Sequence, residues 1–145
     1  MGERSTAAYG AEFAAYLAAL EGEVSQEEQE AIQALPSGSA LLVVRRGPDT
    51  GARFLLDSDA TGAGRHPDAD IFLDDVTVSR RHAEFLRRGN TFELRDLGSL
   101  NGTYYEGSRI EGSVVVRDRS EVQIGKFRLT FYASRVDLAA AAGAE

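Results

Sequence analysis

Apolar and polar side chains alternate along much of this chain after residue 40. In residues 126–133, the apolar positions Phe127, Leu129 and Phe131 are each followed by a more polar one. A period of two places alternate side chains on opposite faces, so it predicts a half-buried β-strand. Alternating or β-branched-rich runs predict short strands at residues 40–46, 54–56, 71–73, 82–88, 91–97, 103–105, 114–116, 121–124 and 126–133.

Turn residues separate these runs. Gly89-Asn90 has the length of a two-residue hairpin turn, and residues 47–51 form a tight Gly- and Pro-containing connection. About nine to eleven short strands joined by such turns predict an all-β fold, an antiparallel β-sandwich.

The first 35 residues have a helical period instead. One stripe with the spacing of a 3.6-residue helix is formed by Phe13, Tyr16, Leu17, Leu20 and Val24. Ser25 and Glu28 form a predicted capping box for a second short helix, which we expect to end before Pro36. We therefore expect a helical or flexible N-terminal segment over residues 1–37, a β-domain over 38–134 and a flexible C-terminal tail over 135–145, with residues 36–39 as a linker.

Charge is distributed unevenly between these parts. The net charge is −7, and residues 1–36 contribute one arginine and seven glutamates, whereas residues 37–145 hold fifteen basic and sixteen acidic groups. An acidic chain of this kind is not expected to bind nucleic acid in general.

No apolar run approaches the roughly 18 residues that span a membrane. The sequence has no cysteine, which excludes disulfides and thiolate metal sites and fits the cytoplasm.

Arginine and serine occur at the turns, where a sheet protein presents binding groups. Arg65 follows Gly64 just before a predicted strand, and Ser79, Arg80 and His82 enter the next one. A guanidinium fork and a hydroxyl suit a phosphate dianion, to which the backbone N–H of Ser79 is a further expected donor. A solvated surface arginine is the alternative for Arg65, and for His82 we expect a role in fixing the loop rather than in chemistry.

A third turn contains Asn101-Gly102, and it follows Ser99 and Leu100. An Asn-Gly pair suits a tight turn, because both residues tolerate positive φ. The asparagine carboxamide has a donor and an acceptor, so it can also bind a peptide backbone. A plain hairpin turn is the alternative.

The order Gly-Arg, Ser-x-x-His and Asn-Gly on short strands resembles the forkhead-associated (FHA) domain, over residues 40–133. The resemblance implies an eleven-stranded sandwich whose loops bind phosphothreonine peptides. The residues implied to bind phosphothreonine are Arg65, Ser79, Arg80, Ser99 and Asn101. Gly64, His82 and Gly102 would shape the loops. Ser99 is included as a substitute, since Leu100 stands where many members have threonine.

Residues 38–44, 70–85 and 121–129 look similar to one group within this family, the actinobacterial GarA/OdhI regulators. The resemblance implies a protein without catalytic residues, metal or cofactor. Unphosphorylated, it would inhibit 2-oxoglutarate dehydrogenase and affect enzymes of glutamate metabolism. A Ser/Thr protein kinase would phosphorylate its N-terminal tail, and the tail phosphothreonine would then occupy the protein's own FHA site.

In that tail Thr6 is the expected phosphoacceptor, with Ser5 beside it and Tyr9 in the aromatic position three residues on. The match is degenerate, because an upstream acidic stretch is missing and Gly10 replaces a basic residue. A second hypothesis is therefore a plain FHA adaptor without self-inhibition. A hydrolase using Ser79, His82 and Asp96 is disfavoured, since strand alternation turns Ser79 and His82 apart. We expect a monomer.

Overall fold

The computed structural model describes residues 25–143, and the predicted phosphoacceptors Ser5 and Thr6 and the stripe from Phe13 to Val24 lie outside them. The chain divides into units of residues 1–31 and 32–145, which we describe separately. Helix α2 (Gln26–Gln33) begins in the first unit, where Ser25 caps it: the Ser25 Oγ accepts the Glu28 N–H at 3.1 Å, and the Ser25 N–H donates to Oε1 of Glu28 at 3.4 Å. This confirms the predicted capping box.

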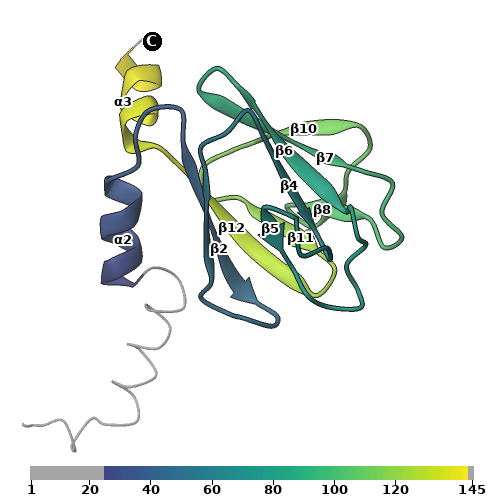
Figure 1. Cartoon of the computed structure of the whole chain (residues 1–145). Helices are drawn as coiled ribbons and strands as arrows, with labels where there is room; N and C mark the ends of the chain where they lie inside the picture. Colours follow the sequence, from purple (N-terminus) through teal and green to yellow (C-terminus); the bar gives the residue numbers. More distant parts are fainter. Residues whose placement is uncertain (1–24, 144–145) are drawn as a thin grey trace, which may run out of the picture. The chain divides into compact units, whose positions relative to one another are not determined.

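The described residues of the second unit form eleven strands, which are arranged in two sheets (Figure 1). One further helix follows the last strand. The strands are β2 (Ala40–Arg46), β3 (Arg53–Leu56), β4 (Ala60–Gly64), β5 (Ile71–Phe72), β6 (Ala83–Arg88), β7 (Thr91–Asp96), β8 (Thr103–Tyr105), β9 (Ser108–Arg109), β10 (Ser113–Val116), β11 (Glu121–Ile124) and β12 (Phe127–Ala133). The helix is α3 (Arg135–Gly143). The predicted all-β sandwich is confirmed, and β4 and β9 are strands that the sequence patterns did not predict.

One sheet has the strand order β10-β7-β6-β4-β5 and the other β3-β2-β12-β11-β8-β9. All neighbours are antiparallel except β4 and β5. The predicted Gly89-Asn90 hairpin joins β6 and β7, with Arg88 opposite Thr91. Alternation along the strands turns the apolar side chains inward between the sheets. There the rings of Phe92 of β7 and Phe131 of β12 pack edge-to-face, with their centroids 5.7 Å apart.

The segment predicted as a linker is held by side chains. Asp137 of α3 accepts hydrogen bonds from the Ser37 hydroxyl (2.6 Å) and the Gly38 N–H (2.7 Å). Ser134 donates to the Leu35 carbonyl, and Arg87 donates to the Gly38 carbonyl. These bonds fix the point at which the chain enters β2.

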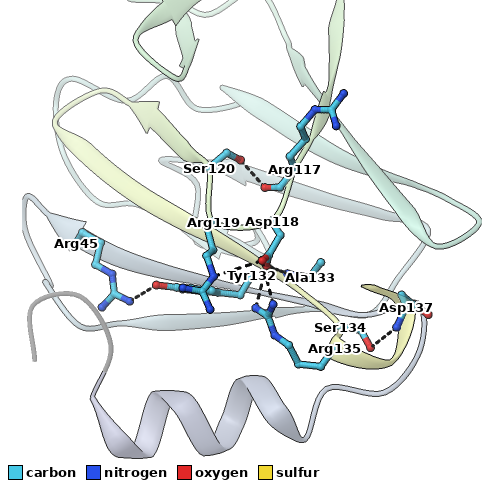
Figure 2. Close-up of polar contacts among 10 residues, drawn as sticks. All are labelled: Arg45, Arg117, Asp118, Arg119, Ser120, Tyr132, Ala133, Ser134, Arg135 and Asp137. Atoms are coloured by element: carbon cyan, nitrogen blue, oxygen red, sulfur yellow. Dashed lines mark hydrogen bonds and ion pairs between the residues drawn. The ribbon is translucent and has the colours of Figure 1, made fainter. Parts of the chain in front are cut away.

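Helix α3 covers most of the residues for which we expected a flexible tail. Its start is fixed by Arg135, whose guanidinium donates two hydrogen bonds of 2.9 Å to Asp118 (Figure 2). Asp118 also accepts the Ala133 N–H, which ties the end of β12 to the preceding loop. Among the described helices, neither α2 nor α3 is long and apolar enough to cross a membrane.

Candidate functional site

Ser79 lies between the other two loops that the sequence singled out. Its carbonyl accepts the Arg65 N–H at 2.9 Å, and its hydroxyl oxygen accepts the Leu100 N–H at 3.0 Å. The first bond joins the loop after β4 to the loop before β6. The second joins that loop to the crossing from β7 to β8. The fold therefore brings Arg65, Ser79 and the Asn101 loop together.

His82 fixes the same loops from beneath. Its ring is fully buried; Nδ1 accepts the Ser79 N–H at 3.1 Å, and Nε2 lies 2.8 Å from the Gly102 carbonyl. An Nδ1 that accepts and an Nε2 that donates describe a neutral imidazole. Burial lowers the pKa of His82, which outweighs the opposite effects of the Gly102 bond and the Asp96 charge. Because both ring nitrogens are engaged by backbone, His82 shapes the loops, and the Ser79 N–H is no longer available to a phosphate.

The glycines allow the loops to pack closely. A Cβ at Gly64 would lie 1.9 Å from the Arg80 carbonyl oxygen, a distance that no side chain tolerates. Gly64 therefore makes room for the backbone of the neighbouring loop rather than for a ligand. Gly102 has φ +83°, and a Cβ there would lie 2.7 Å from Nε of Arg109.

Asp96 organises the loop that contains Asn101. Its carboxylate accepts hydrogen bonds from the Gly98 and Ser99 N–H groups, from the Ser99 hydroxyl (2.5 Å) and from the Thr103 hydroxyl (2.7 Å). Burial acts to raise the pKa of Asp96, but these bonds outweigh it and hold the pKa below its ordinary value. From the sequence we assigned Asp96 no role in shaping this turn, although an Asp two residues before Gly98-Ser99 is a turn signature that could have found it.

Ser99 differs from its expected role as a phosphate contact. It is buried, its hydroxyl donates to Asp96, and the same oxygen accepts the Gly102 N–H at 2.9 Å. Since the donor and the acceptor are both committed within the loop, Ser99 holds the shape of the turn in this structure.

The polar side chains that remain at this edge are exposed or half-buried, and two of them are positively charged arginines. Arg65, Arg80 and Asn101 are exposed, and Ser79 is half-buried. The Ser79 hydroxyl oxygen accepts the Leu100 N–H, and no acceptor for its own O–H is found among the described residues, so that O–H can donate to a ligand. Nε of Arg65 lies 3.8 Å from Asp74, a long ion pair between exposed groups that contributes little. Two arginines, a hydroxyl and a carboxamide thus belong to neighbouring loops, a combination of side chains that suits an anionic ligand.

Comparison with known families agrees with this arrangement. The model of the FHA domain matches residues 61–125, which contain all three loops. A Corynebacterium jeikeium protein called oxoglutarate dehydrogenase inhibitor is 63% identical over 100 residues, which are 69% of each chain. The chain belongs to the FHA family. Its similarity to the glycogen accumulation regulator GarA of Mycobacterium tuberculosis is 54% identity over 127 residues, 88% of this chain and 78% of that protein.

A solved structure gives the same fold. The Mycobacterium tuberculosis EmbR protein in complex with a low-affinity phosphopeptide matches this FHA chain with a TM-score of 0.63 and 28% identity, over 83% of this chain and 29% of EmbR. Family and named relatives point to a binding protein that regulates rather than to an enzyme.

Replacing Gly64 with alanine tests the close packing of the loops. Gly64→Ala should lower the free energy of unfolding by more than about 2 kcal/mol, because the new methyl group displaces the Arg80 backbone. The control is Gly62→Ala in the same strand, where a Cβ meets only Asp70 Oδ2 at 3.9 Å and the change should stay within about 1 kcal/mol. Equal urea midpoints for the two variants would contradict this packing.

Stability should depend on pH through His82. Its pKa in the folded state lies below the ordinary 6.5, so as pH falls below 6.5 the unfolded chain binds the proton first. The free energy of unfolding should therefore decrease between pH 7 and pH 5, and His82→Gln should decrease less steeply in urea titrations. The pKa of Asp96 lies below 3.8, so protonation of that carboxylate does not contribute to the change between pH 7 and pH 5. An NMR titration of the His82 ring that gives a pKa of 6.5 or above would refute the assignment.

Proposed function

We propose that this protein is a phosphothreonine-dependent regulator whose FHA loops bind phosphorylated protein segments. The observation that carries the proposal is the pair of hydrogen bonds through which Ser79 joins the Arg65 loop and the Leu100-Asn101 loop. Those bonds support one continuous site on exposed loops rather than three separate surface features. We further propose residues 1–37 as the regulatory segment, 38–134 as the FHA domain and 135–145 as a C-terminal extension that includes α3.

In this proposal the phosphate binds between Arg65 and Ser79. The Arg65 guanidinium exchanges its long pair with Asp74 for a charge-assisted bond to phosphate oxygen, and the Ser79 hydroxyl donates a second. Arg80 adds positive field from the same loop. Asn101 binds the peptide backbone next to the phosphothreonine through its carboxamide. Ser99 contributes through the shape of the turn.

The regulated partner is proposed from the relatives. Proteins that share 54–63% identity with this chain are called oxoglutarate dehydrogenase inhibitor or GarA. We propose that the unphosphorylated protein inhibits 2-oxoglutarate dehydrogenase in the cytoplasm and so affects glutamate metabolism. The same loops would also bind an activated Ser/Thr kinase.

The proposed switch is phosphorylation of Thr6, with Ser5 as the alternative acceptor. Leu35 and Gly38 are fixed beside the start of β2, and the loops lie near the other end of that strand, where Gly47 meets Lys126. Seven strand residues extend about 23 Å. Helix α2 contributes about 12 Å of rigid length, and the 19 residues from Thr6 to Ser25 would span about 24 Å as a flexible chain, so a tail of this length can match that distance. Tethering gives a local concentration in the mM range, so a modest affinity would close the site.

The test is peptide binding before and after kinase treatment of the full chain. The probes are a phosphothreonine peptide library and residues 1–14 phosphorylated on Thr6, with the unphosphorylated peptide as the control. Wild-type protein should bind only the phosphorylated probes, and Arg65→Ala should weaken binding by more than about tenfold, since a charge-assisted bond is lost. Equal binding of the unphosphorylated peptide would sink the domain-level proposal.

After treatment with a Ser/Thr kinase, wild-type protein should lose binding to the probes and Thr6→Ala should keep it. Inhibition of purified 2-oxoglutarate dehydrogenase should be lost in parallel. If treated wild-type protein still binds fully, the plain adaptor is the better hypothesis. If saturating unphosphorylated protein leaves the dehydrogenase fully active, the proposed metabolic role is wrong.

A further inference from the structure

Thr77 connects the Asn101 loop to two other parts of the domain. It lies two residues before Ser79, and its carbonyl oxygen accepts a hydrogen bond of 2.9 Å from Nδ2 of Asn101. The two residues are 24 positions apart in the chain and belong to different loops. The backbone of Thr77 therefore orients the Asn101 carboxamide, which we propose binds the backbone of the phosphopeptide.

The Thr77 side chain fixes that backbone in turn. Its hydroxyl donates to Asp75 Oδ2 at 2.5 Å, and the Thr77 N–H donates to the same oxygen at 2.9 Å. The hydroxyl oxygen also accepts the Lys126 N–H at 2.9 Å. Lys126 belongs to the turn between β11 and β12, so one hydroxyl group joins the loop before β6 to the six-stranded sheet.

The β11–β12 turn leaves Thr77 little freedom to move. A Cβ at Gly125, where φ is +58°, would lie 2.5 Å from Thr77 Oγ1 and 2.9 Å from the Thr77 carbonyl oxygen. The hydrogen bonds from Thr77 lower the pKa of Asp75, and the nearby charges of Lys126 and Arg65 act in the same direction. An ionised Asp75 is the stronger acceptor for the hydroxyl.

We propose that Thr77 is a positioning residue that orients Asn101 to bind the backbone of a phosphothreonine peptide. This inference rests on the proposed function. Asn101 donates one N–H to Thr77, which leaves its carboxamide oxygen and second N–H to the ligand. Thr77 itself need not touch the phosphate, so its effect on binding passes through Asn101.

A double-mutant cycle separates this role from a general effect on folding. Thr77→Val keeps the side-chain shape but removes the hydroxyl, so it should weaken binding of the residue 1–14 phosphopeptide or the phosphothreonine library by about tenfold. Thr77→Ser keeps the hydroxyl and should bind within about threefold of wild type. Thr130→Val, the same change on a strand away from the loops, should leave affinity unchanged.

The decisive variant combines Thr77→Val with Asn101→Ala. If Thr77 acts through Asn101, the double variant should bind about as weakly as Asn101→Ala alone. Losses that multiply, or a Thr77→Val protein that binds like wild type, would overturn the proposal. Urea midpoints for each variant report folding separately.

If wild-type protein binds neither probe, the proposed function is rejected. The positioning role of Thr77 can then still be tested by a measurement that needs no ligand. In ¹⁵N-labelled full-length protein, the Asn101 side-chain amide should be ordered and distinct in shift. It should average toward a solvent-exposed amide in Thr77→Val and persist in Thr77→Ser. An Asn101 amide signal that is unchanged by Thr77→Val would overturn the positioning role.

Discussion

The buried imidazole of His82 joins loops that belong to two different sheets, and the arrangement of the binding residues depends on it. One nitrogen accepts the Ser79 N–H before β6, and the other binds the Gly102 carbonyl before β8. Because the ring is buried and neutral, these bonds are shielded from water and rigid. Ser79 and Asn101 are then held at a fixed separation before any ligand arrives, which lowers the ordering cost of binding.

Around that ring, polar groups divide into those that build the loops and those that are left to a ligand. The Asp96 carboxylate, the hydroxyls of Ser99 and Thr77 and the Thr77 carbonyl all form hydrogen bonds to neighbouring loop residues. Arg65 and Arg80 remain exposed. A site made in this way binds through preorganised charge and hydrogen bonding. Both ring nitrogens of His82 are committed to backbone groups, so in this arrangement the imidazole does not act as a base for the Ser79 hydroxyl.

Much of the fold and the identity of the loop residues could be predicted from the sequence, because period-two runs and Gly-Arg or Asn-Gly turns are local signals. Strand β4 was missed because Ala60–Gly64 is small and has low β-propensity; it is a strand because β5 and β6 pair with it. Ser99 was expected to contact a phosphate as a substitute for the threonine that Leu100 replaces, but the Asp96 turn directs it inward. The Thr77–Asn101 bond spans 24 residues, so no local pattern predicts it.

The most direct test of the account is the map of NMR shift changes when a phosphothreonine peptide is added to ¹⁵N-labelled protein. One continuous site at the loops predicts that the largest changes cluster at residues 64–65, 77–80 and 99–102 and depend on the phosphate. Changes centred on the groove that Val115 and Leu138 help to line, or equal changes with the unphosphorylated peptide, would contradict it.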